Sequence, residues 1–463
     1  MTVEGWLAMG EAALCGFAIL RRRQLPIGAE FPLIPALLLA HLMLFGLPAA
    51  LFRNEFLGLG SATLWNIAVP ETISSATLRQ TAMVVFAGML ALLVGYELPM
   101  ARVLVAPLPA IRVAWRRNPM PGALILMASG LFAAVLEKEK HSESLEGILG
   151  MFSFVGLWAM GALWLLNWRG VGSRWARLAT WIMTAGLLGL EVIQGVLWRP
   201  LIDLVLLFAI YLRARGRMPW LALALAIPAF LTMAASKIVF RTLLPADQWS
   251  TTGVLEKLGI YGHSLTLAFD DPAGLDLGET LLSRMSETWV LAVVVERSPR
   301  FVPYWNGVTY SAVGWTFVPR LLAPDKPKET TGQDFPHRYG ITAPDDDQTS
   351  TNFAALIELY ANFGPVGAVL GMMLFGIACR GLERLFTDAR FDDATYALAA
   401  PVLASLLLIE QPFHGAFGGF VQHTPFLILI LELCGICAVS IAPATRASIP
   451  ETDRQMAPQQ VCE

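Results

Sequence analysis

Charged residues are scarce in this chain. Asp, Glu, Lys and Arg make up 15% of its 463 residues, whereas hydrophobic residues make up 56%. The mean hydropathy of +0.58 is far from that of a soluble enzyme and indicates many membrane-spanning helices. The net charge is −3, and no basic tract with interleaved aromatic residues occurs, so the sequence predicts no nucleic-acid partner.

Cysteine is scarce as well. The chain has five cysteines, none of them between Lys237 and Thr351, which excludes a disulfide framework for that segment. Cys434-Gly-Ile-Cys437 has the spacing of a redox or metal motif, but we interpret it as two small apolar residues within an apolar helix. The chain also lacks an internal repeat of the kind found in many secondary transporters.

Long apolar runs are abundant. A helix that crosses the hydrocarbon needs about 20 mostly apolar residues, because its backbone groups must be satisfied internally. We expect an all-α polytopic integral membrane protein with about 11 transmembrane helices and one large external loop of helical pieces and turns before the ninth. The expected spans are 3–20, 31–51, 81–98, 121–136, 147–166, 177–197, 200–212, 219–235, 353–379, 395–410 and 424–441.

Basic residues indicate the orientation of the spans. Short cytoplasmic loops collect Lys and Arg, and clusters follow the first, third, fifth, seventh and ninth spans at 21–23, 112–117, 169–177, 213–217 and 380–390. This pattern predicts a multi-pass protein of the bacterial cytoplasmic (inner) membrane, with the N-terminus outside and the C-terminus in the cytoplasm. It divides the chain into transmembrane helices 1–8 (1–236), a large external loop (237–351), transmembrane helices 9–11 (352–441) and a disordered cytoplasmic tail (442–463).

The external segment is rich in aromatic and apolar residues, so we expect it to fold. Trp289–Val295 is an apolar run too short to span, which leaves a small buried helix or a segment dipping into the membrane surface. Prolines and glycines then punctuate 304–310, 318–327, 335–340 and 358–367. They favour a rigid, irregular surface that holds side chains at set positions.

These segments carry a resemblance to a known family. The elements are, in order, Arg284, Gly307-x-x-Tyr310, Pro319-Arg320, Pro324-x-Lys326-Pro327 and Glu358-x-Tyr360-x-Asn362-Phe363-Gly364-x-x-Gly367. This order resembles that of the Wzy-type polymerases, which join bacterial O-antigen and oligosaccharide repeat units. The resemblance implies a glycosyltransferase that polymerises undecaprenyl-diphosphate-linked oligosaccharides into a surface polysaccharide at the outer face of the membrane. It also implies kinship with the O-antigen ligases and leaves room for a chain-length-regulating co-polymerase.

Basic residues suit such a reaction because the diphosphate leaving group gains negative charge as the glycosidic bond breaks. Guanidinium groups pair bidentately with phosphate oxygens. Arg320 and Arg284, which match the family pattern, are the first candidates for catalysis, and Lys326, Arg300 and Arg338 are candidates for substrate binding. The competing interpretation is that these are interfacial residues bound to membrane lipid headgroups or to internal acids.

The candidates for a general base that activates the acceptor hydroxyl are carboxylates near expected outer helix ends, namely Glu191, Asp203, Glu358 and Glu410. Glu358 is the best of them because it lies in the matched motif, with a salt bridge to a loop arginine as its alternative role. His414, in the glycine-rich turn expected at 410–419, and His337 are alternative bases. The aromatic candidates for stacking on sugar rings, with simple interfacial anchoring as the alternative, are Tyr310, Trp305 and Tyr339. We expect no cofactor and no metal, since Asp345–Asp347 lies in a polar turn that favours a solvated loop.

Other functions stay open at this point. A ligase that moves a finished glycan to another acceptor would use the same residues. A transporter or flippase of lipid-linked oligosaccharide would need buried charges near the middle of the membrane. Glu11 and Glu432 are the only acids placed near the middle of an expected span. A non-catalytic assembly scaffold is a third class.

Overall fold

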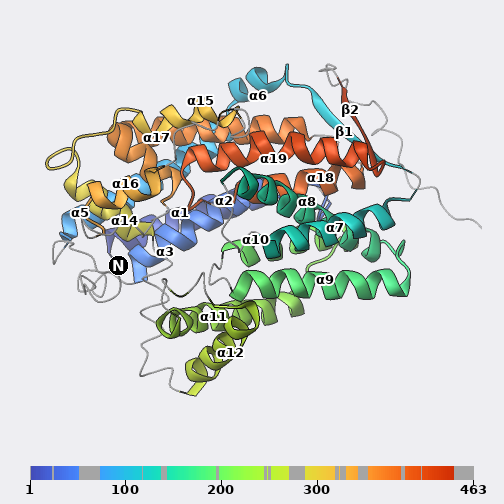
Figure 1. Cartoon of the computed structure of the whole chain (residues 1–463). Helices are drawn as coiled ribbons and strands as arrows, with labels where there is room; N and C mark the ends of the chain where they lie inside the picture. The colour runs from blue at the N-terminus through green and yellow to red at the C-terminus, as the bar shows by residue number, and fades with distance from the viewer. Residues whose placement is uncertain are drawn as a thin grey trace, which may run out of the picture.

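The computed structural model describes residues 2–22, 26–51, 73–116, 118–136, 143–193, 198–244, 248, 252–270, 287–318, 323, 330–342, 353–386, 390, 392–407 and 409–442. They form a helical bundle whose long helices lie roughly side by side, with a two-stranded sheet at one end (Figure 1). The elements are α1 (Val3–Arg21), α2 (Leu33–His41), the π-helical turn η1 (Leu42–Gly46), α3 (Leu47–Leu51), α5 (Ser75–Glu97), α6 (Pro99–Val105), β1 (Ala110–Trp115), α7 (Pro119–Leu136), α8 (Glu143–Trp168), α9 (Arg174–Ile193), α10 (Trp198–Arg215), α11 (Trp220–Leu243), α12 (Val254–Asp270), α14 (Glu287–Arg297), the 3-10 turn η3 (Val308–Ala312), α15 (Val313–Thr316), α16 (Thr331–Arg338), α17 (Ala355–Leu385), α18 (Asp393–Ser405), α19 (Phe413–Leu433) and β2 (Cys437–Ala442).

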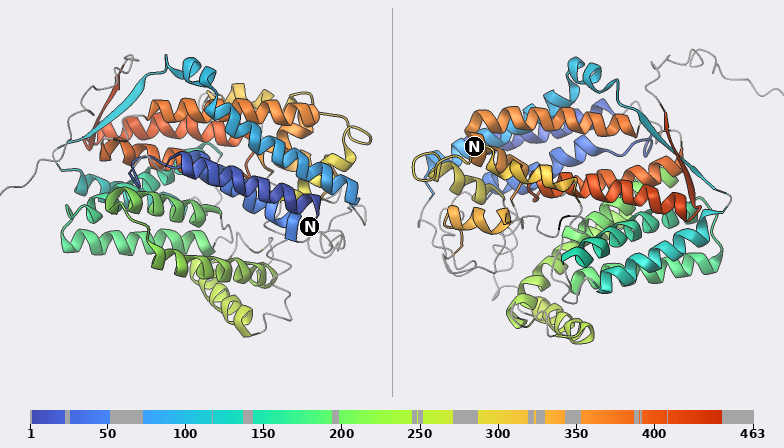
Figure 2. Two further views of the ribbon diagram at one scale, coloured as in Figure 1. Left: turned by 180° about the vertical axis from the view of Figure 1, so that it is seen from behind. Right: turned by 45° about the horizontal axis from the view of Figure 1, so that its top comes forward.

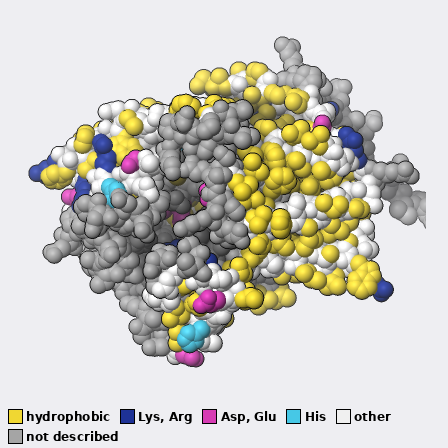
Figure 3. All heavy atoms as spheres, in the orientation of Figure 1, with side chains coloured by type: hydrophobic (Ala, Val, Ile, Leu, Met, Phe, Trp, Pro, Cys, Tyr) yellow, Lys and Arg dark blue, Asp and Glu magenta, His cyan; other side chains and the backbone are white. Residues whose placement is uncertain are grey.

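Eight helical stretches among the described residues are long and apolar enough to cross a membrane. They are α1, the run Leu33–Ala50 built from α2, η1 and α3, α5, α7, Leu145–Trp168 of α8, α9, α17 and α19. One face of the bundle is covered with apolar side chains, as expected for a surface in contact with lipid (Figure 3). The chain is therefore an all-α multi-pass membrane protein. The other three expected spans are the helices α10, α11 and α18, and the count of eleven stays a prediction.

Helix starts follow local sequence. Ser74 precedes α5, and its Oγ accepts the Thr77 amide at 3.0 Å. Asp392 does the same for α18, where its carboxylate accepts the Thr395 amide at 2.7 Å. Such caps satisfy amides that have no acceptor within the helix.

Glycines allow the closest helix contacts. A methyl group at Gly376 of α17 would lie 2.1 Å from the Leu92 carbonyl oxygen of α5, and Gly130 of α7 faces Gly156 of α8 just as closely. Small residues of this kind let helix backbones approach closely in membranes. There van der Waals packing, and not the hydrophobic effect, drives the association of helices. Figure 2 shows the resulting layers from two further sides.

Arginines connect the helix ends at one end of the bundle. Arg22 donates to Glu383 Oε1 at 2.6 Å and to the Tyr96 hydroxyl at 3.0 Å. Arg169 and Arg213 both bind the Asp393 carboxylate, each at 2.8 Å. Arg22 and Arg390 both bind Glu30, and Arg213 donates to the Arg390 carbonyl at 3.0 Å. The basic clusters that follow the expected first, fifth, seventh and ninth spans therefore meet at a common end, as alternation across a membrane requires.

The eleventh span differs from the expectation. We predicted a helix over 424–441, but α19 begins earlier, at Phe413, and ends at Leu433. The prediction is wrong for 434–441, because Gly435 turns the chain with φ +65° and β2 then pairs antiparallel with β1, from Trp115↔Cys437 to Ala110↔Ala442. Cys434 and Cys437 therefore lie beyond the helix, and Ala442, which we placed in the tail, belongs to the sheet. The tail after Ala442 lies outside the described residues.

The run Trp289–Val295 forms most of α14, which is a buried helix. Residues Val290–Val295 are at most 8% exposed. At the start of α14 the Thr288 hydroxyl donates to the Phe45 carbonyl of η1 at 2.6 Å, and near its end Glu296 accepts from Thr77 of α5. Of the two interpretations offered for this run, the structure supports the small buried helix. The other described elements between 252 and 342 are helical pieces and turns.

Candidate functional site

The segment before η3 lies against a break in α17. Gly364 adopts φ +68° and ψ −164°, which interrupts the helix, and Pro365 has no amide to donate to the Ala361 carbonyl. The carbonyls of Ala361 and Asn362 instead accept the amides of Trp305 and Asn306, each at 3.1 Å. The sequence Asn-Phe-Gly-Pro thus creates the acceptors on which the neighbouring segment is held.

Asn362 and Glu358 fix the next residues. Asn362 Oδ1 accepts the Gly307 amide at 2.8 Å, and its Nδ2 donates to Thr309 Oγ1 at 2.8 Å. Thr309 in turn donates to Glu358 Oε1 at 2.6 Å. Gly307 has φ +90°, a conformation that favours glycine, so its place in the motif has a backbone cause.

Glu358 also holds the start of α19. Its second oxygen, Oε2, accepts the Phe413 amide at 2.6 Å, and the side chain is fully buried. Phe413 is the first residue of α19, where an amide has no acceptor within the helix and the helix dipole favours a negative charge. We call Glu358, Asn362, Thr309 and the Phe413 amide the carboxylate clasp. It ties η3, α17 and α19 together.

Aromatic rings form a continuous surface beside the clasp. Tyr310 stacks on Phe363 with ring centroids 6.0 Å apart and meets the edge of Phe413 at 5.7 Å. Phe413 stacks on Phe417 at 5.5 Å, and Phe417 meets Phe317 at 5.8 Å. Phe363 is 46% exposed and Phe317 is 62% exposed. Burial, followed by the nearby Glu358 carboxylate, raises the pKa of Tyr310, so its hydroxyl stays protonated. We call these five residues the aromatic ledge.

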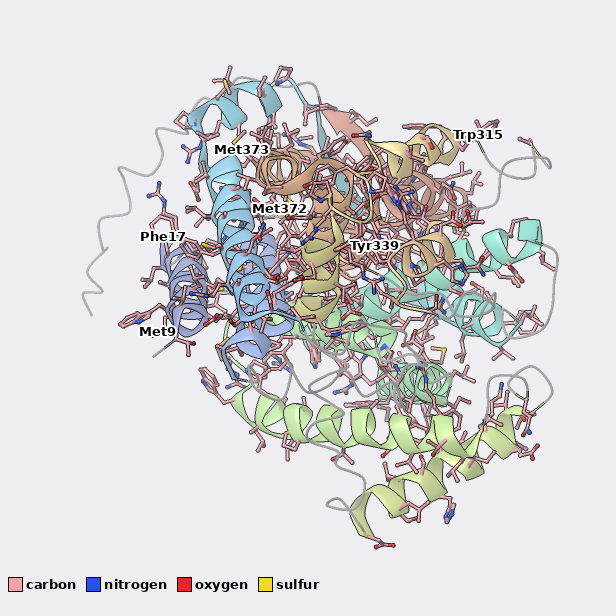
Figure 4. The ribbon with its side chains drawn as sticks, turned by 90° about the vertical axis from the view of Figure 1, so that its left-hand side faces the viewer. Met9, Phe17, Trp315, Tyr339, Met372 and Met373 are labelled. Atoms are coloured by element: carbon pink, nitrogen blue, oxygen red, sulfur yellow. The ribbon has the colours of Figure 1, made fainter. Side chains whose placement is uncertain are left out.

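Trp305 and Tyr339 are more buried than a sugar-stacking role needs. Trp305 is 9% exposed, and the Arg338 guanidinium lies 5.3 Å from its ring centre and donates to the Pro303 carbonyl at 2.7 Å. Tyr339 is fully buried, lies within the end of the bundle (Figure 4), and hydrogen-bonds Ser298 at 2.9 Å. Tyr339 therefore exposes no ring face on which a sugar could stack, as we had expected it to do.

The remaining candidates fall into two groups. His414 lies in the first turn of α19, directly after Phe413, and not in a glycine-rich loop as the sequence suggested; His337 lies in α16, and both are half-buried. Arg300 is exposed in the turn after α14, beside Phe301. Arg284, Arg320 and Lys326 lie outside the described residues, so their roles stay predictions.

A buried acid pair consists of Glu410, which was a candidate from sequence, and Glu287, which was not. Burial, together with the neighbouring Glu410, raises the pKa of Glu287 well above its usual range, although the Ala354 amide at 3.4 Å opposes the shift. Burial also raises the pKa of Glu410, which Lys237 opposes. Glu287 borders the short apolar run of α14. This position beside a run too short to span was the feature of the sequence that could have identified Glu287 as a buried acid.

The described residues hold no group of three or more His, Cys, Asp or Glu side chains arranged to bind a metal ion. Their chemistry is that of a hydrogen-bonded clasp with an exposed aromatic ledge and the adjacent His414. Comparison with protein-family models, with curated proteins and with solved structures gives no match for this chain.

Proposed function

We propose that this protein polymerises lipid-linked oligosaccharide repeat units, carried on undecaprenyl diphosphate, into a surface polysaccharide. The reaction takes place at the outer face of a bacterial cytoplasmic membrane, with the N-terminus outside and the C-terminus inside. The observation that supports it is the meeting of two motif segments far apart in sequence. Gly307–Tyr310 is held on Glu358–Gly364 by the carboxylate clasp, so two of the segments that carry the resemblance lie together.

The roles follow from the chemistry of the donor. Breaking the glycosidic bond leaves a diphosphate, and Arg320 and Arg284 bind its oxygens, with Lys326, Arg300 and Arg338 as further cationic groups. The aromatic ledge offers exposed ring faces to the apolar side of a sugar or to the lipid chain. His414 follows Phe413, one residue from the clasp, and is our choice for the base that accepts the proton of the attacking hydroxyl.

Glu358 has a different role in this proposal. Both of its oxygens accept short hydrogen bonds from Thr309 and Phe413. A carboxylate occupied in this way holds the α19 start and with it His414, so we assign Glu358 as a positioning residue.

A gel-ladder assay separates polymerisation from ligation. Purified protein in detergent receives a short lipid diphosphate-linked oligosaccharide as its sole substrate. A ladder of products with increasing repeat number supports polymerisation. Transfer that occurs only when a separate acceptor is added supports the ligase instead.

A transporter of lipid-linked oligosaccharide is the second candidate, favoured by the buried carboxyl groups of α1. Glu4 and Glu11 are each 1% exposed inside the bundle. Chain growth in detergent, where no closed compartment exists, contradicts transport as the primary activity.

A further inference from the structure

Two carboxyl groups lie on the buried side of α1. Glu4 and Glu11 are seven residues apart, which places them on one helix face two turns apart, and each is 1% exposed. Met9 and Phe17 are 55% and 50% exposed and point away from the neighbouring α5 (Figure 4). The lipid-facing side of α1 is thus apolar, and its acids face the protein.

Neither acid has a complete set of hydrogen-bond partners. Glu4 Oε1, Glu4 Oε2 and Glu11 Oε2 are buried and make no hydrogen bond to the described residues. Buried carboxylate oxygens are normally paired, because their desolvation is costly.

The elements packed against α1 supply no neutralising cation in the described residues. Their titratable groups, with those of α1 itself, are Glu4, Cys15 and Arg21 on α1, His41 on α2, and Arg79, Tyr96 and Glu97 on α5. Arg79 binds the Ser75 carbonyl at the surface, and Tyr96 is engaged by Arg22 and Glu383 at the basic end. His41 Nδ1 lies 2.8 Å from the Leu37 carbonyl of its own helix. Glu287 of α14, on the other side of η1, is a further acid.

Glu11 lies directly against the π-helical turn. A methyl group at Gly46 would be 1.9 Å from Glu11 Oε2, so the carboxyl group packs on the backbone of η1 where only glycine leaves room. π-Helical turns of this kind are frequent at functional sites. The preceding residue, Phe45, accepts the hydrogen bond from Thr288 that anchors α14. The carboxyl group therefore sits one residue from the contact that positions the buried helix of the external segment.

We propose that Glu11, with Glu4 two turns nearer the outer end, forms an internal binding site for a single positive charge, either a proton or a desolvated monovalent cation such as Na⁺. An ionised carboxylate inside a membrane bundle is costly unless it is paired or reaches water. The described neighbours pair neither Glu4 nor Glu11, so a bound positive charge completes the site. This proposal does not depend on the polymerase function.

Infrared spectroscopy of the purified full-length protein in detergent tests the site, because a protonated carboxyl group and a carboxylate absorb at different frequencies. The spectra are recorded at neutral pH in sodium-free buffer for the wild type, for Glu11→Gln and for the control Glu256→Gln, which alters an exposed acid of α12. We expect Glu11→Gln to lose one component of the protonated-carboxyl absorption of the wild type, while other buried acids such as Glu287 keep theirs, and Glu256→Gln to leave the absorption unchanged.

Added NaCl separates the two occupants. If the band disappears with Na⁺ and radiolabelled Na⁺ binds to the wild type but not to Glu11→Gln, the site takes the cation. If the band is insensitive to Na⁺, the site takes the proton.

A wild-type spectrum identical to that of Glu11→Gln in this region would overturn the proposal, since Glu11 would then be ionised with no bound charge. Should Glu11→Gln fail to fold, Glu11→Asp provides the test. It keeps the acid but withdraws it from Gly46, so the band should shift, and an unshifted band would equally overturn the proposal.

Discussion

Removing the Glu358 carboxylate tests whether it holds the start of α19. Glu358→Ala leaves two donors, the buried Thr309 hydroxyl and the partly buried Phe413 amide, without the acceptors that lie 2.6 Å from each. Each lost acceptor costs about 1–3 kcal/mol. At about 2 kcal/mol per donor, the free energy of unfolding of the variant falls by about 4 kcal/mol. The part of about 2 kcal/mol that belongs to the Phe413 amide corresponds to ~30-fold faster exchange of that amide. The Phe413 amide is the sharpest probe because Glu358, not the helix, supplies its acceptor.

Hydrogen exchange followed by mass spectrometry on peptides covering 409–417 measures this effect. Glu256→Ala, which removes an exposed acid of α12, is the matched control and should leave the peptide unchanged. Exchange in Glu358→Ala equal to that of the wild type would refute the clasp. Glu358→Gln separates positioning from proton transfer: a positioning role predicts partial activity together with faster exchange, whereas a general base predicts lost activity with unchanged exchange.

Two further predictions concern the fold. Burial alone would raise the pKa of Asp393, but the hydrogen bonds and charges of Arg169 and Arg213 lower it below its usual range. A lowered pKa in the folded state adds stability at pH values above the ordinary Asp pKa of about 3.9, and this stability is lost as the pH falls through the lower folded-state pKa. Asp393→Asn should therefore flatten the acid side of a plot of melting temperature against pH. An unaltered plot would contradict the ion pairs of Asp393 with Arg169 and Arg213. Gly364→Ala should destabilise the protein by about 1–3 kcal/mol, because φ +68° with ψ −164° is essentially restricted to glycine and the new methyl meets Tyr304 Oη at 2.7 Å; Gly150→Ala, with open space around it, is the control, and equal melting temperatures for the two variants would refute the argument.

The sequence predicted the helices well because the hydrocarbon requires long apolar runs. It failed at the last span, where the glycines of Phe413–Gly419 indicated a turn although the residues are helical. The apolar run Cys437–Ala442 continued the hydropathy signal beyond the helix end. Hydropathy averages over a window, so it cannot separate a helix from a short strand whose partner, β1, lies more than 300 residues earlier.

The candidate site was predicted in part. The resemblance identified Glu358, Asn362 and Gly364, but the pairing of Asn362 with Gly307 depends on a contact across 55 residues that no local pattern contains. The same limit applies to Glu287 and Glu410, which only the folded chain brings together. An acid of an expected span, Glu11, was noted from sequence, and its contact with Gly46 of the π-helical turn appears only in three dimensions.

The most direct test of the proposed function compares three purified proteins on lipid diphosphate-linked oligosaccharide: the wild type, Arg320→Ala, and Arg79→Ala as a control that removes an exposed arginine of α5. We predict a ladder of repeat lengths from the wild type and from Arg79→Ala, and its loss from a folded Arg320→Ala. The absence of any ladder from folded wild-type protein on its native substrate would contradict polymerisation.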